Sequence, residues 1–380
     1  MTKQKRQKII VAVAVIAVIA AAAVWFIFLR GPQYNDNFER KSVKDVIKEA
    51  NNFSGHTYQN FTLPEEINID CGDKLYTFPV SKTKDDVDVS GWVKKLLSDF
   101  SGEEQTGELI DVSISSAGIK TDPEVDVGKG YYCDYCSDGS FVACDNNQDE
   151  YYTRKNKQSY EKEYILEKDD ISGVSYNVAG QDYSIQDAID FSMKFMDENL
   201  SDFFRKDEEL VPESVCVVAT ERDEYYYEIF FQRKYKGCPI STNGESSYDH
   251  EFYSSSYLNV CICMPNKVNR TVLYCNGSFG KETKVKKIIT LESALDYLEE
   301  YLAQYSGYVM TDISLEYCVL YEDAFDNDSE YRPMWCFTVG SSGSQLSGQY
   351  NPRKIIYLDA QTGDVSCYDA GMSQMVFKKN

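Results

Sequence analysis

A helical motif occurs twice in this chain, with an offset of 106 residues between the two copies. Residues 184–191 read Ser-Ile-Gln-Asp-Ala-Ile-Asp-Phe, and residues 290–297 read Thr-Leu-Glu-Ser-Ala-Leu-Asp-Tyr. Each copy opens with a hydroxyl residue, which suits the N-terminal cap of a helix, and then places apolar residues at helical spacing. Strand-like runs follow both copies. A repeat of about 100 residues indicates two related modules and argues against a single large enzyme fold.

The two modules are expected at residues 181–283 and 284–380. Four strand-like runs follow the helix in each module: 215–219, 225–235, 257–264 and 271–275 in the first, and 313–321, 335–339, 354–358 and 364–368 in the second. Residues 31–180 carry no copy of the repeat, and we expect them to form a membrane-proximal α+β domain of unknown type. The predicted fold class is therefore α+β, with one helix against an antiparallel sheet in each module.

The first 30 residues differ in kind from the rest of the chain. Four basic residues precede an uncharged apolar run at positions 9–29, which at 1.5 Å per residue is long enough to cross a hydrocarbon core of about 30 Å. A cleaved signal peptide is the alternative, because residues 20–23 are all Ala and suit a cleavage site. Cleavage there would leave the apolar stretch 24–29 on the mature chain, so we predict a retained anchor. The basic residues before it favour a cytoplasmic N-terminus and extracytoplasmic C-terminal domains.

The net charge limits the class of partner. The chain carries −22 at pH 7, and its first 30 residues hold five positive charges and no negative one, so residues 31–380 carry −27. Such a domain repels nucleic acid and favours cations or basic protein surfaces. Solubility alone is the other explanation of this charge.

Two motifs in the modules resemble a known family. Residues 356–365 read Ile-Tyr-Leu-Asp-Ala-Gln-Thr-Gly-Asp-Val, in which Asp359 can accept hydrogen bonds from turn amides and Gly363 can adopt the left-handed conformation. This hairpin, preceded by the strand at 335–339, resembles the hallmark of PepSY domains. Residues 231–240, Phe-Gln-Arg-Lys-Tyr-Lys-Gly-Cys-Pro-Ile, resemble a strand of the PepSY-type propeptides of secreted metalloproteases.

A single anchor followed by tandem modules of this kind also resembles the accessory regulators of the cell-wall sensor kinase of Gram-positive bacteria, the YycI type. The resemblance implies noncovalent regulation or inhibition of a partner outside the membrane, either a sensor kinase or a protease. It implies no catalysis, and it makes the residues around Asp359 and Gly363 a folding device.

The sequence offers no catalytic set. His56 and His250 are the two histidines, and neither lies in the two-histidine helical motif of a zinc protease. A nucleophile elbow, a phosphate loop and a dinucleotide-binding fingerprint are all missing. We therefore expect no catalytic residues, no cofactor and no dedicated metal site.

Twelve cysteines remain to be explained. Residues 133–144 resemble a hairpin with Asp138-Gly139 as a two-residue turn, which would place Cys133 directly opposite Cys144. We predict a disulfide between Cys133 and Cys144 if the compartment is oxidising. A zinc site that includes Cys136 would lack an obvious fourth ligand. Other cysteines lie in strand-like runs and are expected to be buried apolar thiols: Cys261, Cys263, Cys275, Cys318, Cys336 and Cys367.

The sequence thus predicts a non-catalytic, single-span envelope protein whose modules bind and regulate an envelope partner. The alternative is a cell-surface protein that binds a peptide, glycan or cation through an acidic face rich in tyrosine, of which the chain has 30.

Overall fold

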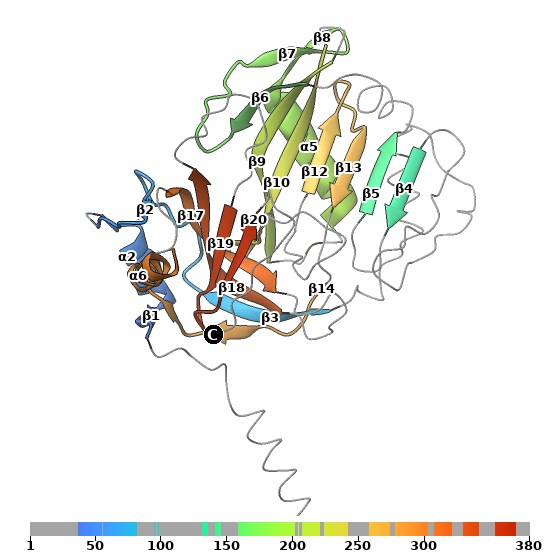
Figure 1. The fold of residues 1–380 in the computed structure, drawn as a ribbon. Helices are drawn as coiled ribbons and strands as arrows, with labels where there is room; N and C mark the ends of the chain where they lie inside the picture. Colours follow the sequence, from blue (N-terminus) through green and yellow to red (C-terminus); the bar gives the residue numbers. More distant parts are fainter. Residues whose placement is uncertain are drawn as a thin grey trace, which may run out of the picture.

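Long β-strands dominate the computed structural model of this chain (Figure 1). The structure describes residues 37–54, 56–81, 95, 98, 131–135, 141–145, 159–201, 204, 207–220, 224–241, 258–273, 278–302, 308–320, 330–341 and 354–369. Within these ranges the chain forms two eight-stranded sheets, two small two-stranded sheets and three helices. The predicted α+β class of helix-plus-sheet modules is therefore wrong, because strands from outside the modules enlarge both sheets and leave the helices a minor part.

The first large sheet has the strand order β4-β5-β13-β12-β10-β9-β6, and β11 also pairs with β10. Its strands are β4 (Tyr131–Tyr135), β5 (Phe141–Asp145), β6 (Ser159–Ile165), β9 (Glu208–Ala219), β10 (Tyr225–Tyr235), β11 (Cys238–Pro239), β12 (Leu258–Ile262) and β13 (Arg270–Leu273). The helix α5 (Ile185–Leu200) shares a hydrophobic core with one face of this sheet.

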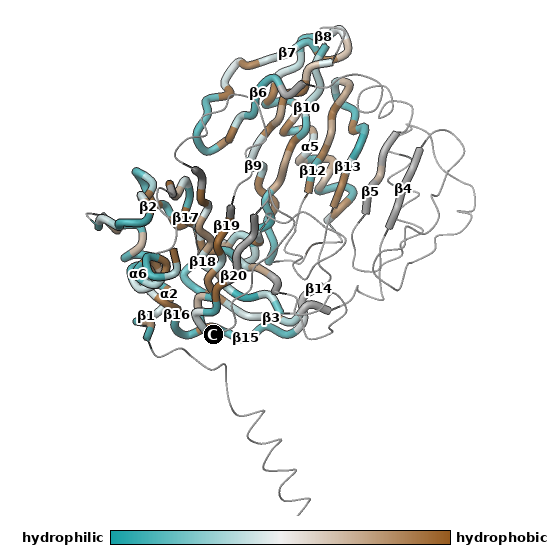
Figure 2. Tube along the Cα trace, viewed as in Figure 1, coloured by the Kyte–Doolittle hydropathy of each residue, from teal (hydrophilic) through white to brown (hydrophobic). Residues whose placement is uncertain are grey.

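The second large sheet is built around β17 (Tyr308–Leu320) and β18 (Glu330–Ser341), which pair antiparallel along their whole length. The hairpin of β19 (Lys354–Asp359) and β20 (Val365–Asp369) continues from β18. Four further strands complete the sheet: β2 (Phe61–Thr62), β3 (Leu75–Ser81), β14 (Ser278–Phe279) and β15 (Thr283–Val285). In Figure 2 apolar residues run along the strands of both sheets.

Both repeated helices begin at the predicted caps. The Ser184 side chain accepts a hydrogen bond from the Asp187 amide at the start of α5, and Thr290 does the same for Ser293 at the start of α6 (Leu291–Tyr301). Capping of this kind satisfies amides that have no partner inside the helix.

A buried aromatic side chain from the second long strand of each sheet fixes the residue before the cap. The Tyr227 hydroxyl donates to the Tyr183 carbonyl at 2.6 Å, and Trp335 Nε1 donates to the Ile289 carbonyl at 3.0 Å. Tyr183 and Ile289 are themselves 106 residues apart. The two repeated segments therefore share a hydrogen bond from a strand to the residue before the helix cap, as well as a sequence motif.

The segments expected to form one membrane-proximal domain lie in different cores. In residues 37–81, β1 (Arg40–Ser42) pairs with β16 (Lys287–Ile289), and α2 (Val43–Ala50) joins the core of the second sheet. In contrast, β6 and the hairpin of β7 (Ser175–Val178) and β8 (Gln181–Ser184) pack with the first sheet. These segments supply edge strands and cover apolar faces that the modules would otherwise expose.

The strand β11 connects the two large sheets. It follows β10 through a two-residue turn in which Lys236 and Gly237 have φ of 52° and 79°. Ile240 then forms a parallel bridge to Tyr317 of β17, and the Ser241 amide donates to the Tyr317 carbonyl at 2.9 Å. The residues after β10 thus belong to both halves.

No helix within the ranges given above is long and apolar enough to cross a membrane. The predicted anchor at residues 9–29 lies outside those ranges.

Candidate functional site

The second large sheet buries side chains on both of its faces. Alternate residues of a strand point to opposite faces. Leu315, Trp335 and Phe337 belong to the main core, together with the helix α6. On the other face a smaller buried cluster contains Cys318, Met334, Cys336, Ile355 and Tyr357.

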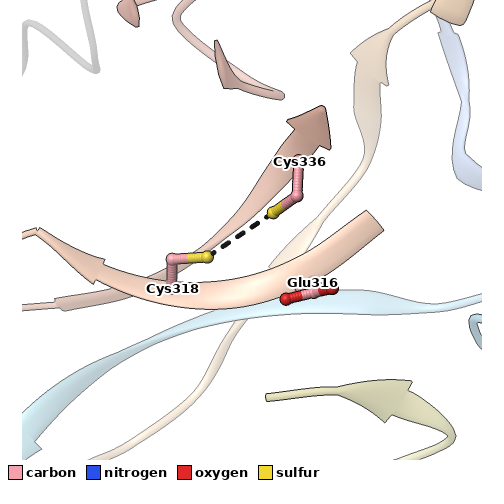
Figure 3. A group of neighbouring side chains, drawn as sticks. All are labelled: Glu316, Cys318 and Cys336. Atoms are coloured by element: carbon pink, nitrogen blue, oxygen red, sulfur yellow. Dashed lines mark hydrogen bonds between the residues drawn. The ribbon is translucent and has the colours of Figure 1, made fainter. Parts of the chain in front are cut away.

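Glu316 lies on this second face beside two of these cysteines, as Figure 3 shows. One ligand atom from each of Glu316, Cys318 and Cys336 lies within 4.8 Å of the other two, and the two Sγ atoms are 3.8 Å apart. The three residues are 6%, 1% and 2% exposed, respectively. Across the residues that the structure describes, this is the one group of three such side chains close enough to share a metal ion.

The Glu316 carboxyl group has one satisfied and one unsatisfied oxygen. Ser314 Oγ donates to Oε1 at 2.6 Å, whereas Oε2 is buried and has no hydrogen-bond partner among the described residues. Burial raises the pKa of Glu316, although Ser314 and the nearby Ser241 favour the charged form. A buried carboxyl oxygen without a partner is costly, so this side chain needs either a proton or a cation.

Burial favours the neutral form of the Cys336 thiol in the metal-free cluster. Burial raises the pKa of Cys336 well above its usual value, and the neighbouring Cys318 raises it further. The Cys336 thiol lies 3.6 Å from the Met334 carbonyl, to which it donates. A buried neutral thiol of this kind is a poor nucleophile, so the cluster is not suited to covalent catalysis.

The strand register does not place the two cysteines opposite each other. Cys318 pairs with Arg332, and Cys336 pairs with Ser314. Even the nearest diagonal positions of an antiparallel pair are about 7–8 Å apart, beyond the usual Cα separation across a disulfide. The thiols therefore meet through the lean of their side chains, in an arrangement that does not favour an S–S bond.

Among the described residues the first sheet has no copy of this cluster. When the two central hairpins are aligned on Tyr227 and Trp335, which also aligns their β-bulges, the pair Cys216–Glu228 takes the place of Ser314–Cys336. Val218 and Thr220 take the places of Glu316 and Cys318. The first sheet does bury a thiol pair: Cys261 lies in β12, Cys263 follows the end of that strand, and their Sγ atoms are 3.5 Å apart.

The predicted disulfide rested on a register that proves wrong by one residue. In the hairpin of β4 and β5, Cys133 pairs with Ala143 and Tyr132 pairs with Cys144. An odd number of residues separates the closing pair Tyr135–Phe141, so a two-residue turn is not formed. The register therefore gives no support to a disulfide between Cys133 and Cys144.

The turn at residues 359–363 is the folding device that the sequence predicts. Asp359 Oδ1 accepts from the Gln361 and Thr362 amides at 2.7 and 3.0 Å, and Gly363 has φ of 89°. Asp359 is fully buried and also contacts Arg332; burial raises its pKa even though these partners favour the carboxylate. At Gly363 the turn packs against the Phe38 ring.

Comparison with known proteins gives a fold but no family. No family model matches the sequence, and no curated protein matches it either. The structure is similar to the crystal structure of an uncharacterized protein from Eubacterium rectale, with a TM-score of 0.51 and 15% sequence identity, over 80% of this chain and 90% of that one. At this identity the similarity concerns the fold alone.

Sequence reasoning did not bring Glu316, Cys318 and Cys336 together. It treated the two cysteines as separate buried thiols and did not consider Glu316. The one local signal is Glu-x-Cys within a strand, which puts both side chains on one face. The third residue comes from the neighbouring strand, and its position depends on the register.

Proposed function

We propose that this protein is a non-catalytic binding protein of the bacterial cell envelope, anchored through residues 9–29 with its folded part outside the membrane. It binds an extended segment of another envelope protein along the free edge of β20. A sensor kinase or an envelope protease is the partner class that the PepSY-like motifs suggest.

The observation that carries this proposal is the state of the β20 edge. Within the described part of the chain β20 pairs only with β19. The Asp359 amide donates to the Asp364 carbonyl, so these two residues form a hydrogen-bonded pair. Hydrogen-bonded and non-hydrogen-bonded pairs alternate along an antiparallel ladder. The amides and carbonyls of Val365, Cys367 and Asp369 therefore point away from β19. The stretch 365–368 carries no charge. Such an edge can accept an added strand.

The edge at β6 of the first sheet is protected in contrast. The outward amide of Ile165 donates to Asp169 Oδ2 at 2.7 Å, and its carbonyl accepts from the Lys168 and Asp169 amides. Glu161, Lys162 and Glu163 also place charges along this strand. Blocked amides and charged side chains are the usual defence against strand addition, so β6 provides a natural comparison for β20.

Charge supports a basic partner. The −27 of residues 31–380 would attract a positively charged segment and speed its association at low ionic strength. Support for a non-catalytic role comes from the burial of Glu316, Cys318 and Cys336, since a substrate has no access to side chains this deeply enclosed.

Site-specific photo-crosslinking in living cells tests the proposal. A photoreactive amino acid is introduced at Ser366 in β20, at Glu163 in β6 or at Tyr132 in β4, and the crosslinked proteins are identified by mass spectrometry. We expect one envelope protein to be captured in near-stoichiometric amount from position 366 and not from 163. Capture from β6 or β4 alone would refute the assignment of the edge. Recovery of no partner at any position would favour the small-ligand alternative.

A further inference from the structure

We infer that Glu316, Cys318 and Cys336 form a structural zinc site in the second sheet, with both thiolates and the carboxylate as ligands. The site is distinct from the proposed binding edge and does not depend on it.

The sulfur separation fits the geometry that Zn²⁺ prefers. With Zn–S bonds of about 2.3 Å and a tetrahedral angle, two zinc-bound sulfurs lie about 3.8 Å apart. The two Sγ atoms are 3.8 Å apart, and the carboxyl oxygen lies within 4.8 Å of both. The three side chains therefore offer three ligand atoms close together.

The burial of the Glu316 carboxyl group beside the two thiols points to the carboxylate as a ligand. Ser314 holds Oε1 by a hydrogen bond, and Oε2 is buried with Ser241 and Cys336 close to the carboxyl group. A hydrogen bond to the second oxygen of a ligating carboxylate is the usual way in which a protein orients such a ligand. A divalent cation would also remove the cost of burying the negative charge.

Ser241 completes the surroundings of the site. Its hydroxyl is buried and lies beside the Glu316 carboxyl group, whose charged form it favours. It is therefore the residue best placed for the fourth position. Ser241 follows β11, which comes from the first sheet, so zinc would connect the two halves of the molecule.

Two simpler explanations fit less well. A disulfide is disfavoured because Cys336 lies four residues along β18 from Arg332, the register partner of Cys318. A plain apolar core explains two buried thiols but not a buried carboxyl group beside them. The Cys261–Cys263 pair of the first sheet has no third ligand of this kind among the described residues.

Zinc binding releases protons in a defined way. Each thiol loses its proton when its sulfur bonds to zinc, and the carboxyl group loses its proton if it carries one. Because two thiols are deprotonated, the apparent affinity should fall at least about a hundredfold for each unit by which the pH is lowered near neutrality.

Elemental analysis of the purified full-length protein, expressed with zinc in the medium, tests the inference. We expect one zinc per chain in the wild type and in Cys261→Ser, which removes a buried thiol from the other sheet. Cys318→Ser and Cys336→Ser should hold none, and Glu316→Gln should bind zinc more than tenfold more weakly. Wild-type protein that is folded and free of zinc would overturn the inference, as would full zinc content in Cys336→Ser.

Cobalt substitution separates loss of the site from loss of the fold. Wild-type protein loaded with Co²⁺ should show near-ultraviolet thiolate-to-metal charge transfer and the strong visible bands of a tetrahedral site. Glu316→Gln keeps the shape of the side chain and both thiols, so it should fold and show an altered, weakened spectrum. A Co²⁺ spectrum identical to that of the wild type would exclude Glu316 as a ligand.

Discussion

The ion pair between Arg233 and Glu208 should be one of the most sensitive points of the first sheet. Arg233 Nη2 lies 3.0 Å from Glu208 Oε2, and both side chains are 1% exposed. Arg233 belongs to the run at residues 231–240, and its guanidinium also lies 5.3 Å from the centre of the Phe204 ring. This buried pair gives the motif's arginine a structural role.

Removal of one partner takes from the other the counter-charge that lies 3.0 Å away. Glu208→Gln keeps the size of the side chain but removes the negative charge, and should lower the free energy of unfolding by about 3–5 kcal/mol. Arg233→Met leaves the carboxylate alone and should cost a similar amount. The double replacement Arg233→Met with Glu208→Leu removes both charges, so it should cost less than either single change.

Urea unfolding followed by far-ultraviolet circular dichroism measures these differences. Glu198→Gln is the matched control, because Glu198 pairs with Lys194 on the exposed surface of α5 and should show no measurable loss. The reasoning fails if Glu208→Gln behaves like the Glu198 control, or if the effects of the two single replacements simply add in the double variant.

Three further predictions follow from the same geometry. Gly363→Ala should destabilise the fold by more than about 3 kcal/mol, because Gly363 has φ of 89° and an added Cβ would lie 2.1 Å from the Phe38 ring. Gly173→Ala is the control, since Gly173 has φ of 71° but open space around it. It should lose only about 1–2 kcal/mol in the same unfolding assay. Peptide mapping under non-reducing conditions should find no bond between Cys133 and Cys144, and recovery of that linkage would show that the register is wrong. In zinc-free protein, burial raises the pKa of Glu316 in the folded state above its unfolded value near 4.5. The protonated carboxyl group therefore stabilises the fold at pH values below the unfolded pKa. This stabilisation is lost as the pH rises through the pKa of the folded state. Glu316→Gln should therefore gain stability relative to the wild type between pH 4 and pH 8, and a constant difference across that range would contradict the raised pKa.

Local patterns in the sequence located individual elements well. Both helix caps, the full extent of β10 and the role of Asp359 and Gly363 followed from spacing, capping and turn chemistry. These features depend on residues within a few positions of each other, and their physical causes are visible in the sequence.

The assembly of those elements was not predictable in the same way. The pairing of β3 with β18 and of β1 with β16 joins segments more than 240 residues apart, and no local pattern encodes such a pairing. The register of β4 and β5 differs from the expected one by a single residue, so Cys133 pairs with Ala143 and not with Cys144. A shift of this size is enough to change which residues share a face of a sheet. Similarly, the cluster of Glu316, Cys318 and Cys336 exists only through the register of β17 and β18.

The central claim is that an envelope partner adds a strand to β20, and removal of one outward amide tests it most directly. Cys367→Pro deletes an amide that points away from β19, so the hairpin should still fold. Cys367→Ser is the control, because it changes the side chain and keeps the amide. After in-cell crosslinking of the tagged full-length protein, we predict that the partner copurifies with the wild type and Cys367→Ser but not with Cys367→Pro. Undiminished recovery of the partner with a folded Cys367→Pro variant would contradict the account.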